Sequence, residues 1–267
     1  MNTVLLARTW EAQRAKLLAV ALALGGWGFL MPVIYASYGA QFRSLMESGV
    51  IPRQLAEFGG GDIFSLPGAV SLGFIHPIAV ALNCVFAIGF STGSVAGERQ
   101  RGTLEVLLAR PISRRSLALT LYAAIVLFVA ITTAAFLVGV FVASALWGVS
   151  AELGLSRLPL LWLNGVLLFA AFGAIGLAAS VSFDRMTPVL AIALGFTIVS
   201  YFVDVLGSLW PDAKGLQPLS LFDYLKPSDV LSGTATPVDF AVLAGVAAAG
   251  VAFALVRFPA RDLAAPS

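Results

Sequence analysis

Two long stretches without a single charged residue dominate this sequence. One covers residues 63–96 and the other covers residues 116–151. Each is longer than the roughly 20 apolar residues that an α-helix needs to cross the hydrocarbon core of a bilayer. The whole chain is 59% hydrophobic and 11% charged, whereas soluble domains have about 25% charged residues. The sequence therefore predicts an integral membrane protein.

Apolar runs of membrane length recur along the chain and predict an all-α fold with six transmembrane helices. The first run is too long for the ~7–15-residue apolar region of a secretory signal peptide, so we expect a retained helix. The last begins with Thr236, Pro237 and Asp239, a helix-capping arrangement. One transmembrane domain is expected over residues 1–267. The predicted helices cover residues 17–38, 67–96 (interrupted at His76-Pro77), 116–149, 158–183, 187–210 and 236–258.

The distribution of basic residues predicts the orientation of these helices. If the N-terminus is cytoplasmic, eleven of the 16 Lys and Arg residues fall in cytoplasmic segments. Because cytoplasmic segments of membrane proteins are enriched in basic residues, both termini are predicted to be cytoplasmic. Residues 39–66 and 211–236 then form external loops, the first with one or two short interfacial helices that end at a flexible turn, Gly59–Gly61. Residues 1–16 mix apolar and basic side chains, so they form either an amphipathic segment at the membrane surface or a frayed tail.

Residues 97–116, the central loop, are an island of charge between the second and third helices. Five of the chain's basic residues lie in its sequence, GERQRGTLEVLLARPISRRS. Leu104, Leu107 and Leu108 follow the spacing of one helical face, which predicts a short amphipathic helix. This helix either docks into a groove of a cytoplasmic protein, or lies on the bilayer while the basic residues only fix topology.

The ends of this short helix are also predicted by its residue types. Gly102 favours a turn, Thr103 is a candidate N-cap, and Glu105 suits the positive end of the helix. Pro111 is expected to end the helix, and Ser113 to cap the third transmembrane helix.

The run GERQRGTLEVLLARPISRR resembles the signature of type-2 ABC exporter permeases. It is similar to the corresponding run in the permeases of nitrous-oxide-reductase maturation, bacitracin export and sodium export. The six-helix layout and the length agree with the resemblance, while its specificity lies in about twenty residues. It implies that the central loop forms a coupling helix seated on an ATPase subunit. The implied contact residues are Glu98, Gly102, Thr103, Leu104, Glu105, Leu107, Leu108, Pro111 and Arg114.

The resemblance also implies an assembly and a location. A phosphate-binding P-loop needs GxxxxGK followed by Ser or Thr, and the three lysines of this chain precede Leu, Gly and Pro. The chain is therefore expected not to be an enzyme: ATP and magnesium would bind a separate ATPase. The implied assembly is two permeases, identical or related, with two ATPases in a prokaryotic plasma membrane. Residues 219–233 resemble the family's external loop more weakly, and residues 1–16 correspond to its amphipathic connecting helix.

Three glycines at four-residue spacing end the second helix: Gly89, Gly93 and Gly97. Such a ridge has no side chains, so a neighbouring helix can approach closely. The pattern predicts close packing here, although the chain is rich in glycine throughout.

Polar residues within the apolar runs suggest a second class of function. Asp204, His76 and Asn83 are candidates for a substrate path, and the first two for ion transport in a secondary transporter or channel. Simpler roles are an interfacial position for Asp204 and hydrogen bonds within the bundle for the others. Neither HExxH, nor GxSxG, nor a metal-ligand spacing is present, which disfavours a membrane enzyme. The small, dispersed net charge of +2 disfavours nucleic-acid binding.

Overall fold

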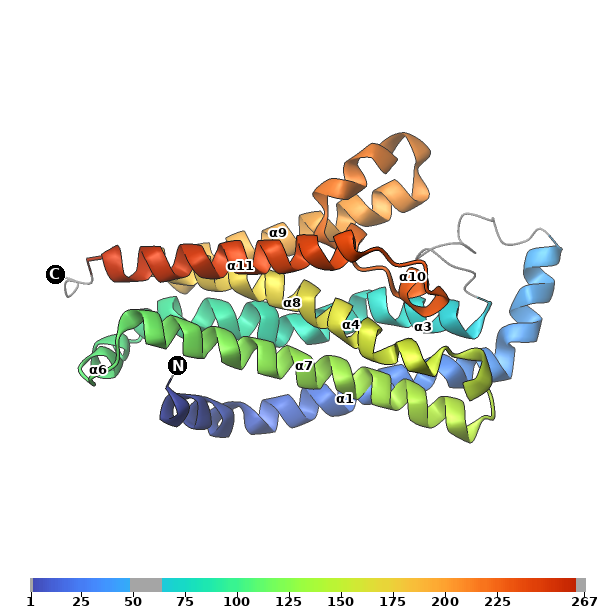
Figure 1. The fold of residues 1–267 in the computed structure, drawn as a ribbon, viewed down its shortest axis with the longest axis horizontal. Coiled ribbons are helices and arrows are strands. Elements are labelled where there is room, and N and C mark those ends of the chain that lie inside the picture. Colours follow the sequence, from blue (N-terminus) through green and yellow to red (C-terminus); the bar gives the residue numbers. More distant parts are fainter. Residues whose placement is uncertain (1, 49–63, 263–267) are drawn as a thin grey trace.

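The structure is a computed structural model that describes residues 2–48 and 64–262. Within these residues, five helices are long and apolar enough to cross a membrane, and one bent helix pair adds a sixth span. They run side by side along the long axis of the molecule (Figure 1). The elements are α1 Thr3–Glu47, α3 Leu66–Ile75, α4 Pro77–Cys84, η1 Val85–Phe90, η2 Gly93–Gly97, α5 Glu98–Gln100, α6 Leu104–Leu108, α7 Arg114–Leu146, η3 Ser150–Glu152, η4 Leu155–Arg157, α8 Leu158–Ser180, α9 Met186–Leu209, η5 Pro211–Leu219, η6 Leu221–Tyr224, α10 Pro227–Ser232 and α11 Pro237–Ala260.

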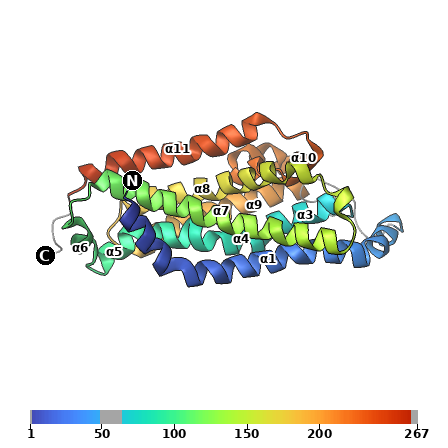
Figure 2. The same cartoon turned by 60° about the horizontal axis from the view of Figure 1, so that its bottom comes forward.

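The first helix is longer at both ends than the sequence predicts. α1 starts at Thr3, so the predicted segment 1–16 joins the first span as one helix, and its first turns run in a different direction from the rest (Figure 2). The backbone N–H of Asn2 donates to Thr120 Oγ1 on α7 at 2.9 Å, which ties the start of the chain to the bundle. Helix α1 also continues to Glu47, so the residues after 38 are helical as predicted, but the predicted break between the first span and a separate interfacial helix is wrong. The predicted Gly59–Gly61 turn lies outside the described residues.

The second span is bent and irregular. α3 and α4 meet at an angle of 46° at the predicted His76-Pro77 interruption. After α4, the helix changes twice to π-helical geometry, in η1 and η2. π-Helices have i→i−5 in place of i→i−4 hydrogen bonds, and where the two geometries meet, a backbone group can be left for a side chain to satisfy.

The core of the bundle depends on a close approach between α1 and α7. A Cβ atom at Gly28 would lie 2.1 Å from the carbonyl oxygen of Phe136, and one at Gly139 would lie 2.0 Å from that of Gly25. Only glycine fits at such a crossing, because any side chain would force the two backbones apart. Phenylalanines fill the interior beside it, with Phe74 and Phe136 packed edge to face at 5.1 Å between ring centroids.

The predicted glycine ridge does not mediate such a contact within the chain. A Cβ atom at Gly89 would find its nearest neighbour 3.9 Å away, and at Gly93 only the Met186 side chain comes within 3.9 Å. At Gly97 the neighbours are the side chains of Met186 and Arg101. The prediction of close helix packing by this ridge is therefore wrong for the single chain.

The two ends of the bundle have different architecture. The central loop and both chain termini lie at one end (Figures 1 and 2). At the other end, residues 211–232 form η5, η6 and α10 where the sequence predicted a loop, and part of this segment projects from the bundle with the end of α9 (Figure 1). The predicted capping box of the last helix is present: Thr236 and Asp239 bond reciprocally at the start of α11.

Candidate functional site

The central loop contains two short helices joined by a tight turn. Gly102 has a φ of +71°, the left-handed region that favours glycine, so the predicted turn is confirmed. Thr103 does not cap α6 with its side chain, which corrects the predicted N-cap. Its hydroxyl instead points to Glu98, where the single O–H can donate to the carbonyl oxygen at 3.1 Å or to Oε2 at 2.5 Å. Glu98 also accepts a hydrogen bond from the Arg101 guanidinium. This carboxylate therefore binds residues on both sides of the turn at Gly102.

The short helix α6 is anchored by one leucine. Leu104 is 2% exposed and packs in a cluster with residues of α7, α8 and α11, including Leu117, Leu177 and Phe258. Leu107 and Leu108 are half-buried. The implied role of Leu104 as a contact for a soluble partner is therefore wrong, because its side chain already lies inside the chain.

The opposite face of α6 is free of such packing. Val106 is 66% exposed, an apolar side chain at the end of the molecule. Glu105, Ala109, Arg110 and Pro111 are exposed beside it. An outward-facing valine among polar and charged residues is an arrangement that suits contact with another protein.

Arg114, another implied contact residue, bonds within the chain. Its Nη1 donates to the carbonyl oxygen of Arg261 at 2.6 Å and to that of Phe258 at 3.3 Å. These carbonyls belong to the last turn of α11 and the residue just beyond it, where helix carbonyls lack intrahelical partners. Arg114 therefore fixes the end of α11 against the start of α7, whose predicted Ser113 cap is confirmed by a 3.1 Å bond from the Ser116 N–H.

Asp184 joins three segments at this end of the bundle. Its Oδ1 lies 2.6 Å from Nε of Arg99, in the central loop, and also accepts from the Arg261 guanidinium beyond α11. Arg261 donates in addition to the carbonyl oxygens of Val181 and Phe183, each at 3.0 Å. Burial lowers the pKa of the Arg261 guanidinium, and the charge of Asp184 opposes that shift. The central loop is thereby tied to the α8–α9 turn and to the end of α11.

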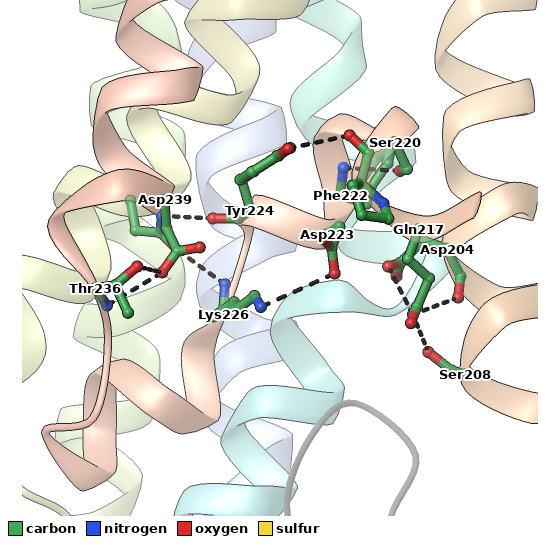
Figure 3. A network of polar contacts seen from close by, with 12 residues as sticks. Asp204, Ser208, Gln217, Ser220, Phe222, Asp223, Tyr224, Lys226, Thr236 and Asp239 are labelled. Carbon is green, nitrogen blue, oxygen red and sulfur yellow. Dashed lines mark hydrogen bonds and ion pairs between the residues drawn. The ribbon is translucent and has the colours of Figure 1, made fainter. Parts of the chain in front are cut away.

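A polar network occupies the opposite end of the bundle (Figure 3). The Gln217 amide donates to the Asp204 carbonyl oxygen at 3.2 Å and to Ser208 Oγ at 3.1 Å. Lys226 pairs with Asp223 at 3.9 Å. Asp204 lines a cavity of about 150 Å³ with these groups.

The other two candidates for a substrate path lie elsewhere. His76 lines a separate, apolar cavity beside Trp27, with 4.8 Å between ring centroids, and its Nδ1 accepts from the Ile78 N–H to cap α4. Asn83 is buried and accepts from Thr132 Oγ1 at 2.8 Å, a bond between helices. The structure does not bring His76 and Asp204 into one site. Among the described residues, no group of three or more His, Cys, Asp or Glu side chains gathers as for a metal ion.

Two residues that join distant segments of the chain were not predicted from the sequence. Asn164, fully buried on α8, donates to the Tyr224 carbonyl oxygen at 3.0 Å and accepts from the Lys226 N–H at 3.1 Å. Asp184 has its arginine partners about 80 residues away along the chain. Its position in a short turn between two apolar runs was the only signal, and it does not indicate a partner.

The fold and the loop together define a multi-pass helical membrane protein with a structured loop between its second and third spans. Residues 13–263 match the family described as ABC-2 family transporter protein. The chain belongs to this family, which makes it a membrane permease subunit of an ABC transporter that works with an ABC ATPase. A search of curated proteins gave no match.

Proposed function

We propose that the chain is the permease of an ATP-driven exporter and that its central loop couples a separate ATPase to movement of the helices. The observation that carries this proposal is the two-sided geometry of α6. One leucine fastens the helix into the core of the bundle, while Val106 on the other face is left exposed. A partner that moves the exposed face therefore also moves the core.

The ion pairs around the loop provide a route for that movement. Arg99 and Arg114 attach the loop region to the α8–α9 turn and to the end of α11. A displacement of the loop is thereby passed to three other spans, α7, α9 and α11. This supports alternating access, in which ATP-driven closure of two ATPases changes which side of two paired permeases is open. The loop and both termini would then be cytoplasmic, in a prokaryotic plasma membrane.

Export as the direction of transport follows the resemblance of the central loop to permeases of nitrous-oxide-reductase maturation, bacitracin export and sodium export. The alternative is a secondary transporter or channel that uses Asp204 and His76. It is the weaker proposal, because these residues line different cavities.

Co-purification in mild detergent tests the proposal. The tagged permease should recover a P-loop ATPase, and Val106→Asp should reduce this recovery at least tenfold. Val238→Asp is the matched control: Val238 is 61% exposed, close to the 66% of Val106, but it lies at the other end of the bundle. Equal ATPase recovery with both variants would refute the coupling role of α6, and absence of any ATPase would favour the secondary transporter.

A further inference from the structure

In the inner part of the second span, the Ser180 side chain of α8 forms hydrogen bonds with the backbone of a neighbouring helix. Ala96 N–H and Thr92 C=O stand four residues apart, the spacing of an α-helical hydrogen bond. The Ser180 hydroxyl lies between them, accepting from the first at 3.0 Å and donating to the second at 2.8 Å. It also accepts from the Val95 N–H at 3.2 Å. A side chain inserted into the i→i−4 ladder distorts a helix, and here the segment is the π-helix η2.

The Ser180 hydroxyl makes all of its hydrogen bonds with the backbone of residues 92–96. A hydroxyl donates one hydrogen bond and accepts two, and all three are used here. Ser180 is fully buried at the last residue of α8. Helix α8 is held close to the second span at Gly176, where an added Cβ atom would lie 2.1 Å from Ser91 Oγ.

The glycine face of η2 contacts flexible side chains. Around Gly93 and Gly97, an added Cβ atom would meet only the ends of the flexible Met186 and Arg101 side chains, at 3.7 Å or more. Most of η2, from Ser94 to Gly97, is buried, so a change of its register requires these flexible side chains to shift.

We propose that Ser180 is a positioning residue that holds η2 in π-helical register and thereby sets the orientation of the central loop. Without the hydroxyl, Ala96 N–H can bond directly to Thr92 C=O. The helix then loses the extra residue of the π-turn, and the start of the central loop turns by about 100° and shifts by about 1.5 Å relative to the rest of the bundle. The first helix of the central loop, α5, begins directly after η2, at Glu98, so the direction of the loop changes with this register. The consequence for coupling rests on the proposed function, whereas the register itself does not.

The test is a distance measured by double electron–electron resonance in the purified permease, without any ATPase. Spin labels are placed at Val106 and Val256, which are 66% and 69% exposed, in a Cys84→Ser background. Ser180→Ala should shift the distance by about 5 Å, the radius of a helix with its side chains. Ser180→Thr should restore it. Ser182→Ala is the matched control, because Ser182 donates only to the Ala178 carbonyl oxygen of its own helix. An unchanged distance in Ser180→Ala overturns the proposal.

Deletion of Gly93 tests the same register if Ser180→Ala fails to fold. Removal of one residue from a π-turn restores an α-helix without turning the central loop, so the deletion should leave the label distance at its wild-type value. A shifted distance or an unfolded protein, as expected for a deletion in a regular α-helix, contradicts the proposal. ATPase co-purification is scored separately: its absence in the wild type refutes coupling and leaves the distance result intact.

Discussion

At each end of the bundle, one side chain holds a distant segment by hydrogen bonds to its backbone. The side chain is charged at one end and neutral at the other. At the loop end, the charged side chain of Arg114 bonds to carbonyl oxygens of Phe258 and Arg261. At the other end, the neutral side chain of Asn164 bonds to the backbone of Tyr224 and Lys226. In both cases a side chain from a distant part of the sequence satisfies backbone groups at helix ends or between helices, which have no partner within a regular helix.

The difference lies in the surface that each end leaves exposed. The loop end uses Glu98, Arg99 and Arg114 for contacts within the chain, and exposes Val106 on α6. The other end encloses Asp204 in a network of short helices. The charged residues that mark the central loop in the sequence are therefore largely structural, and the surface available to a partner is the outer face of α6.

The largest effect is expected for Leu104→Ala. Removing a fully packed leucine leaves a cavity, which costs about 2–5 kcal/mol. We expect a marked fall in the fraction of monodisperse permease after heating in detergent. Val106→Ala on the opposite face should change stability by no more than about 0.5 kcal/mol. Equal losses in the two variants would contradict the two-sided description of α6.

Asn164→Ala is expected to have the next largest effect. It leaves a buried carbonyl oxygen at Tyr224 and a backbone N–H at Lys226 without their partner, which costs about 2 kcal/mol. Because no charge is involved, the loss in thermal stability should be the same in low and high salt. A loss that disappears in high salt would show that this end is not held by neutral bonds.

Asp184→Asn should have a smaller effect that depends on salt. The carboxylate is 57% exposed, so its pairs with Arg99 and Arg261 are partly screened and contribute about 1 kcal/mol together. The difference in unfolding temperature from the wild type should shrink as salt rises. A loss of stability as large as that of Leu104→Ala, or one independent of salt, would contradict the claim that the loop end is held by charged bonds and the other end by neutral ones.

The spans were predictable because each depends on local sequence. Apolar length defined the six helices, and Thr236, Pro237 and Asp239 marked the start of the last one to the residue. The extension of α1 to Glu47 was missed because mixed polarity after Tyr38 is equally compatible with a separate interfacial helix.

The site was less predictable because its contacts join distant residues. The leucine spacing indicated one face for α6, but periodicity does not tell whether that face packs inward or toward a partner, and Leu104 packs inward. Gly93 and Gly97 fit a packing motif, yet their neighbour is the long Met186 side chain of α9, which keeps the two backbones apart. Ser180 carries no signal in the sequence, since its partners are more than 80 residues away.

The most direct test of the coupling role is photocrosslinking in cells with a photoreactive amino acid placed at Val106. Val142 on α7, also exposed but within a membrane span, is the matched control. Val106 should form a crosslink to an ABC ATPase, and Val142 should not. A crosslinked ATPase at neither position, or at both equally, would contradict the claim that the outer face of α6 is the surface on which the ATPase acts.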